Sequence, residues 1–263
     1  MPPGSGSSVS EKPPDETPGE IVSRFVPSPN HSERRDGRRP DLLLLHYTGM
    51  PTAEAALARL CDPAAQVSAH YLVLEDGAVV QLVPEDRRAW HAGAASWAGE
   101  TDINSCSIGI EIVNPGHEGG LPPYPERQIA SLIGLCRPII DHWGIAPERV
   151  LGHSDVAPGR KEDPGELFPW RRLFEAGIGH WIEPAAITDD VVLAPDDVGP
   201  EVRALQDALA FYGYGLDPTG TYDEPTRLVV AAFQRHFRPE RVDGILDAST
   251  FATLQDLIAS RPG

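Results

Sequence analysis

The chain has 263 residues and a formal net charge of −17 at pH 7, with 41% hydrophobic and 23% charged residues. This length and composition are typical of a globular protein with one sizeable core and room for a small second domain. The excess of acidic residues argues against a nucleic-acid or anionic membrane partner, because phosphate binding needs clustered Lys and Arg. No apolar run approaches the length of a membrane span.

The first 20 residues are rich in Pro, Gly, Ser and acidic residues, and we expect a disordered leader there. They lack the basic and apolar regions of a secretory signal, so the sequence as written predicts a cytoplasmic protein. A start upstream or a removed leader would instead place it in the periplasm or at the outer membrane. The three cysteines form no CxxC pair and are expected to be free structural thiols.

The structured part is expected to begin near Ile21. Residues 41–49, DLLLLHYTG, form an apolar run with a polar end, which predicts a strand buried on both faces with His46 at its C-terminal end. Such a strand implies a central sheet covered by helices. Residues 52–62 then predict a helix with Thr52 as its N-cap.

Further strands and a helix follow in alternation. Residues 70–84 predict a hairpin around an Asp-Gly turn, and residues 105–116 predict a strand with Glu111 on the face opposite three alternating isoleucines. Residues 126–143 have helical spacing, although Pro138 is expected to kink the helix or end it early. Alternating strands and helices predict an α/β domain over residues 21–182.

The C-terminal part has a different pattern. Residues 183–196 are acidic and contain proline, which predicts a linker, and residues 197–263 predict a module of three short amphipathic helices. Two similar turns precede the second and third helices, each with an expected threonine N-cap. The linker composition predicts two separately folded units, coupled mainly by effective concentration.

The loop LGHSDVAPGRKEDPG, residues 151–165, carries the chemistry. His153 and Asp163 are ten residues apart, and a loop of this length can turn both side chains toward one point. His46 is the candidate third member. Two neutral imidazoles and one carboxylate form a common catalytic zinc set, with an open position for water.

Amide hydrolysis also needs a base for the proton of water and a positive charge beside the developing oxyanion. Glu111 and Lys161 are the candidates for these two roles. The alternative interpretation makes Glu111 a solvated strand residue and Lys161 its salt-bridge partner, and spacing alone does not separate the two.

The segments LLLLHYTG, VSAHYLVLEDGAVVQLVPEDRRAWHAG, SIGIEIVNPG and GHSDVAPGRKEDPG, in this order, resemble the zinc-dependent N-acetylmuramoyl-L-alanine amidases of the AmpD and AmiD type. The resemblance covers about residues 21 to 180. It implies a central mixed β-sheet flanked by helices, and one zinc ion per chain held by His46, His153 and Asp163. Glu111 would then be the general base and Lys161 the oxyanion stabiliser.

Other positions follow from the same likeness. His91 and Trp97 resemble residues that line the substrate groove, with a role in core or loop packing as the alternative for both. Asp155 lies only two residues from His153, so it is expected to support the metal ligands from behind or to cap the loop, and not to bind metal. Residues 197–263 resemble the three-helix peptidoglycan-binding module, with Asp247 and Pro218 as departures from its pattern.

These observations predict a hydrolase that cleaves the amide between N-acetylmuramic acid, or its 1,6-anhydro form, and L-alanine of the stem peptide, in cell-wall turnover or recycling. Its expected partner is peptidoglycan or a muropeptide, and we expect a monomer. The alternatives are a non-catalytic peptidoglycan-recognition protein and a phage-type lysin.

Overall fold

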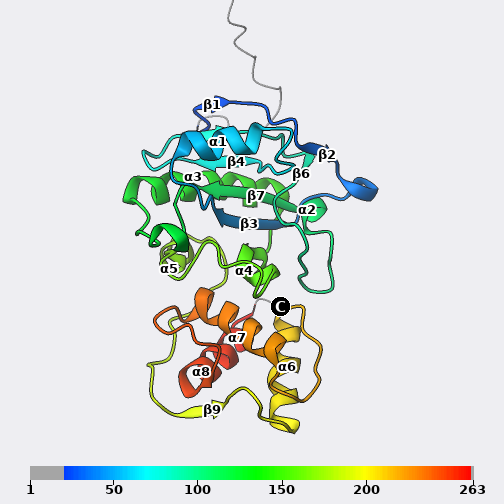
Figure 1. Cartoon of the computed structure of the whole chain (residues 1–263), viewed down its shortest axis with the longest axis vertical. Helices are drawn as coiled ribbons and strands as arrows, with labels where there is room; N and C mark the ends of the chain where they lie inside the picture. The colour runs from blue at the N-terminus through cyan, green and yellow to red at the C-terminus, as the bar shows by residue number, and fades with distance from the viewer. Residues whose placement is uncertain (1–20, 262–263) are drawn as a thin grey trace, which may run out of the picture.

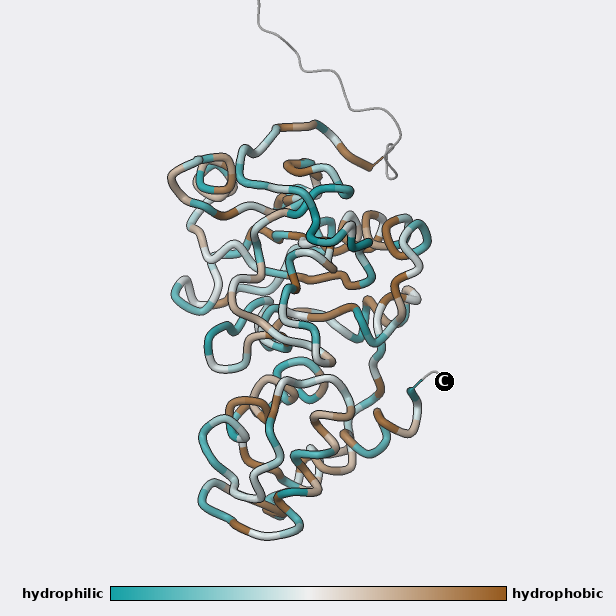
Figure 2. Tube along the Cα trace, turned by 90° about the vertical axis from the view of Figure 1, so that its right-hand side faces the viewer, coloured by the Kyte–Doolittle hydropathy of each residue, from teal (hydrophilic) through white to brown (hydrophobic). Residues whose placement is uncertain are grey.

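The computed structural model describes residues 21–261, so the expected leader at residues 1–20 lies outside the described residues. An α/β unit and a helical unit lie one below the other along the long axis of the molecule (Figure 1). Figure 2 shows hydrophobic stretches in the interior of the α/β unit.

A six-stranded sheet forms the centre of the α/β unit. Its neighbouring strands are β1 (Arg24–Phe25), β5 (Val79–Gln81), β4 (Tyr71–Val73), β7 (Ser107–Ile112), β3 (Leu42–Tyr47) and β8 (Val150–Gly152). Only β4 and β5 pair antiparallel, and the other pairs are parallel. The expected mixed sheet is therefore confirmed. Outside it, β2 (His31–Glu33) pairs antiparallel with β6 (Arg87–Ala89).

Buried leucines explain why β3 lies inside the sheet. The four consecutive side chains Leu42–Leu45 have no exposed surface, which is possible only for a strand covered on both faces. The β4–β5 hairpin turns at Gly77, whose φ of +87° favours glycine. A Cβ there would also lie 3.1 Å from the Arg127 carbonyl oxygen, so this position favours glycine for steric reasons as well. The hairpin predicted from the Asp-Gly pair is present.

Helices cover both faces of the sheet. One hydrophobic cluster joins α1 (Ala53–Cys61) to β4 and β5, and another joins α3 (Glu126–Trp143) to β3 and β7. Thr52 caps α1 by accepting a hydrogen bond from the Ala55 amide at 3.2 Å, as expected. Helix α3 does not end early at Pro138: it continues to Trp143 and stops at Gly144, which is left-handed.

Short helical turns complete the α/β unit. They are η1 (Arg35–Gly37), α2 (Ile103–Cys106), η2 (His117–Gly119), η3 (Pro147–Arg149), α4 (His153–Val156) and α5 (Trp170–Glu175). The three cysteines are free, as expected.

The C-terminal unit contains the three expected helices, α6 (Pro200–Tyr212), α7 (Glu224–Phe237) and α8 (Ala248–Ala259). Part of the expected linker forms a strand instead: β9 (Val191–Leu193) pairs antiparallel with β10 (Leu246–Asp247). The boundaries 183–196 and 197–263 remain a prediction.

The internal repeat has aspartate caps, so the expected threonine N-caps are wrong. Asp223 accepts from the Thr226 amide before α7, and Asp247 accepts from the Thr250 amide before α8. Each of these threonine hydroxyls also donates to the same aspartate, at 2.6 Å from Thr226 and at 2.7 Å from Thr250. Asp247, a departure from the module's usual glycine, is therefore a helix cap.

A buried glutamine supports each copy of this turn from the preceding helix. Gln206 donates to the Thr226 hydroxyl at 2.8 Å and accepts from the Gly220 amide at 2.8 Å. Gln234 donates to the Thr250 hydroxyl at 3.3 Å and accepts from the Gly244 amide at 2.8 Å. The two glutamines make the same hydrogen bonds, so the weak sequence repeat is a structural one.

The two units share one hydrophobic core. Trp97 of the α/β unit packs edge-on against Tyr212 and Tyr214, with ring centroids 6.0 and 4.9 Å apart. Gly213 makes this packing possible, since a Cβ there would lie 2.5 Å from the Trp97 ring. The linker is therefore not the main coupling between the two units, because a buried aromatic interface joins them, and linker composition carries no information about such an interface. Separate folding of each unit stays a prediction.

We predict that Trp97→Ala destabilises the whole chain. Trp97 is only 2% exposed, and truncating such a side chain costs about 3–5 kcal/mol of unfolding free energy. Denaturant unfolding measures this loss, with Val198→Ala at a 74% exposed position as the control. An unchanged free energy of unfolding for Trp97→Ala would contradict the shared core.

Candidate active site

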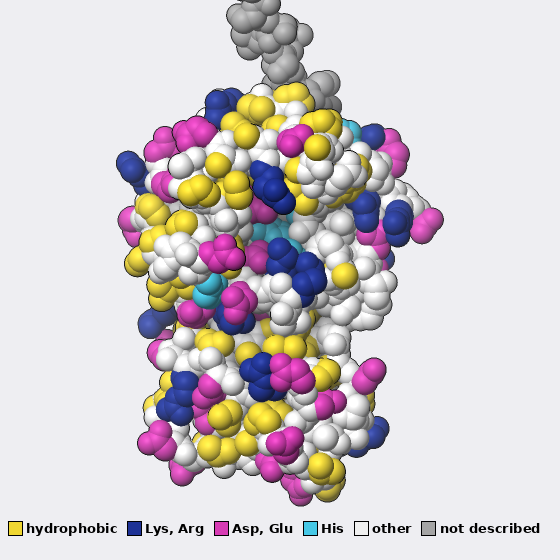
Figure 3. Space-filling model, in the orientation of Figure 1, with side chains coloured by type: hydrophobic (Ala, Val, Ile, Leu, Met, Phe, Trp, Pro, Cys, Tyr) yellow, Lys and Arg dark blue, Asp and Glu magenta, His cyan; other side chains and the backbone are white. Residues whose placement is uncertain are grey.

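A cavity of about 490 Å³ opens beside the C-terminal ends of β3 and β7. Its lining includes all five residues of the predicted centre: His46, Glu111, His153, Lys161 and Asp163. Figure 3 shows histidine and acidic side chains in a hollow of the α/β unit, with Lys and Arg side chains next to them.

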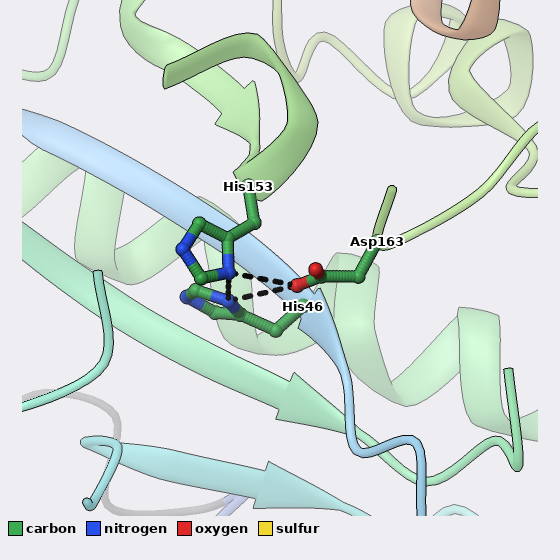
Figure 4. Close-up of side chains that lie close together, drawn as sticks. All are labelled: His46, His153 and Asp163. Atoms are coloured by element: carbon green, nitrogen blue, oxygen red, sulfur yellow. Dashed lines mark hydrogen bonds and ion pairs between the residues drawn. The ribbon is translucent and has the colours of Figure 1, made fainter. Parts of the chain in front are cut away.

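Three of these side chains converge on one point (Figure 4). The Nδ1 atoms of His46 and His153 lie 2.9 Å apart, and each lies 3.0 Å from Oδ2 of Asp163. His46 belongs to β3, His153 is the first residue of α4, and Asp163 lies in the loop that follows. The sheet brings the two histidines together because β8, which ends just before His153, pairs parallel with β3.

The donor set suits a divalent metal ion. Burial and the neighbouring His153 lower the pKa of His46 from 6.5 to about 4, which keeps this imidazole neutral. Burial opposes the ionisation of Asp163, but the two imidazoles outweigh it and hold the pKa of Asp163 below its usual range. Two imidazole nitrogens and one carboxylate oxygen, about 3 Å from one another, match the ligands that zinc binds at about 2 Å in catalytic sites.

Hydrogen bonds behind His46 fix which of its ring nitrogens is free. The Ser107 hydroxyl donates to the Ile103 carbonyl at 2.5 Å, so its oxygen accepts from Nε2–H of His91 at 3.2 Å. Nδ1 of His91 then accepts from Nε2–H of His46 at 3.1 Å. The lone pair of His46 is therefore on Nδ1, which faces the other two donors.

His153 is held in the same tautomer by a backbone group. Its Nε2 lies 2.9 Å from the Ala92 carbonyl oxygen, which accepts only, so this nitrogen carries the proton. Its Nδ1 lone pair then faces the site. A carbonyl or imidazole partner behind each ligating histidine is the usual arrangement around bound metal.

Glu111 lies beside the metal-ligand set and has an unused oxygen. Its backbone pairs with His46 across β3 and β7. Within residues 21–261, its buried Oε2 has no hydrogen-bond partner. Burial and the Asp163 carboxylate raise the pKa of Glu111 well above its usual value, while the Lys161 ammonium lowers it. The carboxylate is thus poised to accept a proton.

Lys161 lines the cavity two residues before Asp163. The carboxylates next to it in the chain pair with other groups, Asp163 with His46 and His153, and Glu162 with His117 and Arg235. Within residues 21–261, no ion pair involves Lys161 and the buried Oε2 of Glu111 has no partner, so there is no Glu111–Lys161 salt bridge among them. The alternative interpretation of this pair as a surface ion pair is therefore not supported.

The predicted substrate contacts have two different outcomes. His91 lines the cavity, but both its ring nitrogens are bound to His46 and Ser107, so it supports the metal-ligand set. Trp97 is not part of the cavity lining and belongs to the shared core with the C-terminal unit. The expected groove role of Trp97 is corrected accordingly, because its indole ring is covered by two tyrosines.

Sequence reasoning missed a second histidine network at the rim of the cavity. The Tyr47 hydroxyl lies 3.0 Å from Nδ1 of His117, and Nε2 of His117 lies 3.0 Å from a Glu166 carboxylate oxygen. Tyr47 directly follows His46 at the end of its strand, and this position was the sequence feature that could have indicated the network.

Asp155 is not in the metal-ligand set and accepts from the Gly152 amide at 2.8 Å.

Comparison with known proteins agrees with this geometry. Residues 36–166 match the N-acetylmuramoyl-L-alanine amidase family, and residues 198–254 match a putative peptidoglycan binding domain. The chain is 39% identical over 232 residues to N-acetylmuramoyl-L-alanine amidase AmiD of Escherichia coli (strain K12), an alignment that spans 84% of this chain and 83% of that protein.

The chain belongs to the N-acetylmuramoyl-L-alanine amidase family. It is also 38% identical over 171 residues to 1,6-anhydro-N-acetylmuramyl-L-alanine amidase AmpD of Escherichia coli (strain K12), over 58% of this chain and 91% of AmpD. The expected family and the α/β fold with its mixed sheet are confirmed.

Solved amidase structures have the same fold. The complex of AmiD from E. coli with anhydro-N-acetylmuramic acid-L-Ala-D-gamma-Glu-L-Lys superimposes with a TM-score of 0.72 at 39% identity, and covers 87% of this chain and 92% of AmiD. AmpDh3 from Pseudomonas aeruginosa, in complex with an anhydromuramic pentapeptide, gives a TM-score of 0.71 at 34% identity, over 88% and 96% of the two chains.

One further observation concerns membranes. Over residues 21–261 of this amidase, no helix has both the length and the apolar character needed to cross a bilayer.

We predict that His153→Ala and Asp163→Ala each lose bound zinc and amidase activity together, because each removes one of the three converging donors. Metal analysis of the purified variants, alongside turnover of a muramoyl-peptide, measures both quantities. A fully zinc-loaded His153→Ala protein would contradict the ligand assignment.

We predict that Glu111→Gln retains zinc but slows turnover by about 10²- to 10⁴-fold, because the amide keeps the side-chain shape and cannot accept the proton. Lys161→Ala should slow turnover by roughly 10²- to 10³-fold, by analogy with a lost oxyanion donor. Steady-state kinetics with zinc content and melting temperature tests both variants. Normal turnover in folded, zinc-loaded Glu111→Gln would end the general-base assignment.

Proposed function

We propose that the protein is a zinc-dependent amidase that cleaves the bond between N-acetylmuramic acid and L-alanine of the peptidoglycan stem peptide. The observation that carries this proposal is the convergence of His46, His153 and Asp163 beside Glu111 in one cavity. The residues fit a single zinc ion, since they offer two imidazole nitrogens and one carboxylate oxygen.

Two side chains of the protein have separate roles in the reaction beside the zinc ion. When bound, zinc supplies Lewis acidity and lowers the pKa of a coordinated water to about 7. Glu111 accepts the proton of the attacking water at its unpartnered Oε2 and later returns it to the leaving amine. Lys161 places positive charge where the amide oxygen becomes negative.

We propose the 1,6-anhydro form of the muropeptide as a substrate. AmiD and AmpDh3 were solved with anhydromuramyl peptides, and AmpD is named for the same group. The match of residues 198–254 to a putative peptidoglycan binding domain favours action on intact sacculi as well. A protein in the cytoplasm would meet released muropeptides, whereas one in the periplasm would meet sacculi. Fractionation of cells that express the native gene distinguishes the two compartments.

A non-catalytic recognition protein is the second candidate function. Recognition alone would need neither a buried carboxylate oxygen that lacks a hydrogen-bond partner among residues 21–261 nor, over the same residues, an ammonium group without an ion-pair partner in the same cavity. Both features, at Glu111 and Lys161, favour the enzyme. A phage-type lysin shares the chemistry and differs in its biological source.

We predict that chelation abolishes hydrolysis of an anhydromuramyl peptide and that added zinc restores it. Removing the metal takes away the Lewis acid while leaving Glu111 and Lys161 in place. Chromatographic detection of the released peptide after treatment with chelator, then with zinc, measures the effect. Full activity in protein shown to be metal-free would overturn the proposal, whereas zinc binding without turnover would favour the recognition protein.

A further inference from the structure

A fully buried carboxylate lies at the start of the loop that carries His153 and Asp163. Asp155 has no exposed surface, and its Oδ2 accepts from the amide of Gly152, the residue just before His153. The position of Asp155 is thus tied to the backbone that presents His153. A Cβ on Gly152 would lie 2.7 Å from Pro164, so this backbone packs closely against the residue after Asp163.

The other two donors to Asp155 come from the C-terminal unit. The Tyr214 hydroxyl donates to Oδ1 at 2.9 Å, and Nδ1–H of His236 donates to Oδ2 at 2.7 Å. A buried carboxylate is costly unless its oxygens are hydrogen-bonded. The C-terminal unit therefore determines whether Asp155 can stay in its place behind His153.

The residue next to His236 contacts the other side of the same loop. Arg235 lies 3.3 Å from a carboxylate oxygen of Glu162 and 3.6 Å from one of Glu166, and these two residues flank Asp163. Consecutive residues of α7 thus hold the loop near both of its metal ligands. Figure 1 shows α7 facing α4 across the junction of the two units.

Close packing joins the loop to the C-terminal unit. The His236 ring stacks between Trp170 and Phe237, with centroid distances of 3.7 and 3.9 Å. A Cβ on Gly159 in the loop would lie 2.5 Å from Leu228 of α7. The loop therefore contacts the C-terminal unit directly.

We infer that Tyr214 and His236 are positioning residues for the zinc site, acting through Asp155, so that the C-terminal unit is a structural part of the catalytic centre. This inference rests on the proposed function, because it assigns the two residues a role in zinc binding. Removing a direct hydrogen-bond partner of a metal ligand typically changes metal affinity or activity by about 10- to 100-fold. Tyr214 and His236 act one step further back, through Asp155 and the Gly152 amide, so we expect effects near the lower end of that range.

Two substitutions at one position separate the hydrogen bond from the packing. His236→Phe keeps an aromatic ring between Trp170 and Phe237 but removes the donor to Asp155. His236→Asn places an amide N–H near the position of Nδ1 but removes the ring. Tyr214→Phe removes only the hydroxyl. We expect the zinc dissociation constant to rise about 10-fold in His236→Phe and Tyr214→Phe, and to stay near the wild-type value in His236→Asn.

The measurement is competition for zinc alone between the full-length protein and a chelating dye, with the melting temperature recorded for each variant. Leu257→Ala is the control for loss of stability, because this fully buried side chain lies on α8 and makes no hydrogen bond to the loop. We expect Leu257→Ala and His236→Asn to lower the melting temperature without weakening zinc binding.

Wild-type zinc affinity in folded His236→Phe and Tyr214→Phe would overturn this inference and leave the proposed function intact. Equal weakening of zinc binding by Leu257→Ala and His236→Phe would also overturn it, because it would show a general effect of instability. Failure of the wild-type protein to bind zinc would reject the proposed function itself.

Discussion

The parallel pairing of β3 with β7 and β8 is the constraint on which the site depends. It sets the backbone of Glu111 beside that of His46, and it sets the end of β8, just before His153, beside the same strand. The C-terminal ends of parallel strands lie at one edge of a sheet, so functional side chains from three distant segments come together there. The four buried leucines of β3 hold this edge in place, since slipping the register would move His46 away from both neighbours.

The surroundings of the polar groups at this edge shift their pKa values in different directions. Burial and the neighbouring His153 keep the pKa of His46 low and its lone pair available, while burial and Asp163 keep the pKa of Glu111 high. Adjacent groups with opposite tendencies are typical of centres that bind metal and move protons. The hydrogen bonds from Ser107 through His91 to His46 add the orientation that a ligand needs.

Much of this could be predicted from the sequence, because the signals were local. Local residue patterns predicted the buried strand at 41–49, the hairpin at the Asp-Gly turn and the Gly-rich loop. The order of these segments along the chain indicated the family. What could not be predicted depends on contacts between distant segments. Trp97 looked like a groove residue, yet it packs against Tyr212 and Tyr214, and no periodicity in either segment encodes that contact. Asp155 was expected to support the metal ligands or to cap its own loop, but nothing in the sequence indicated its hydrogen bonds to the C-terminal unit.

The most direct test of the account is a crystal structure of the zinc-loaded protein with anomalous diffraction data at the zinc absorption edge. We predict one zinc peak bound by Nδ1 of His46, Nδ1 of His153 and a carboxylate oxygen of Asp163, with Glu111 outside the ligand set. Zinc bound through Nε2 of either histidine, or at a place that excludes His46, would contradict the tautomers and the ligand set on which the mechanism rests.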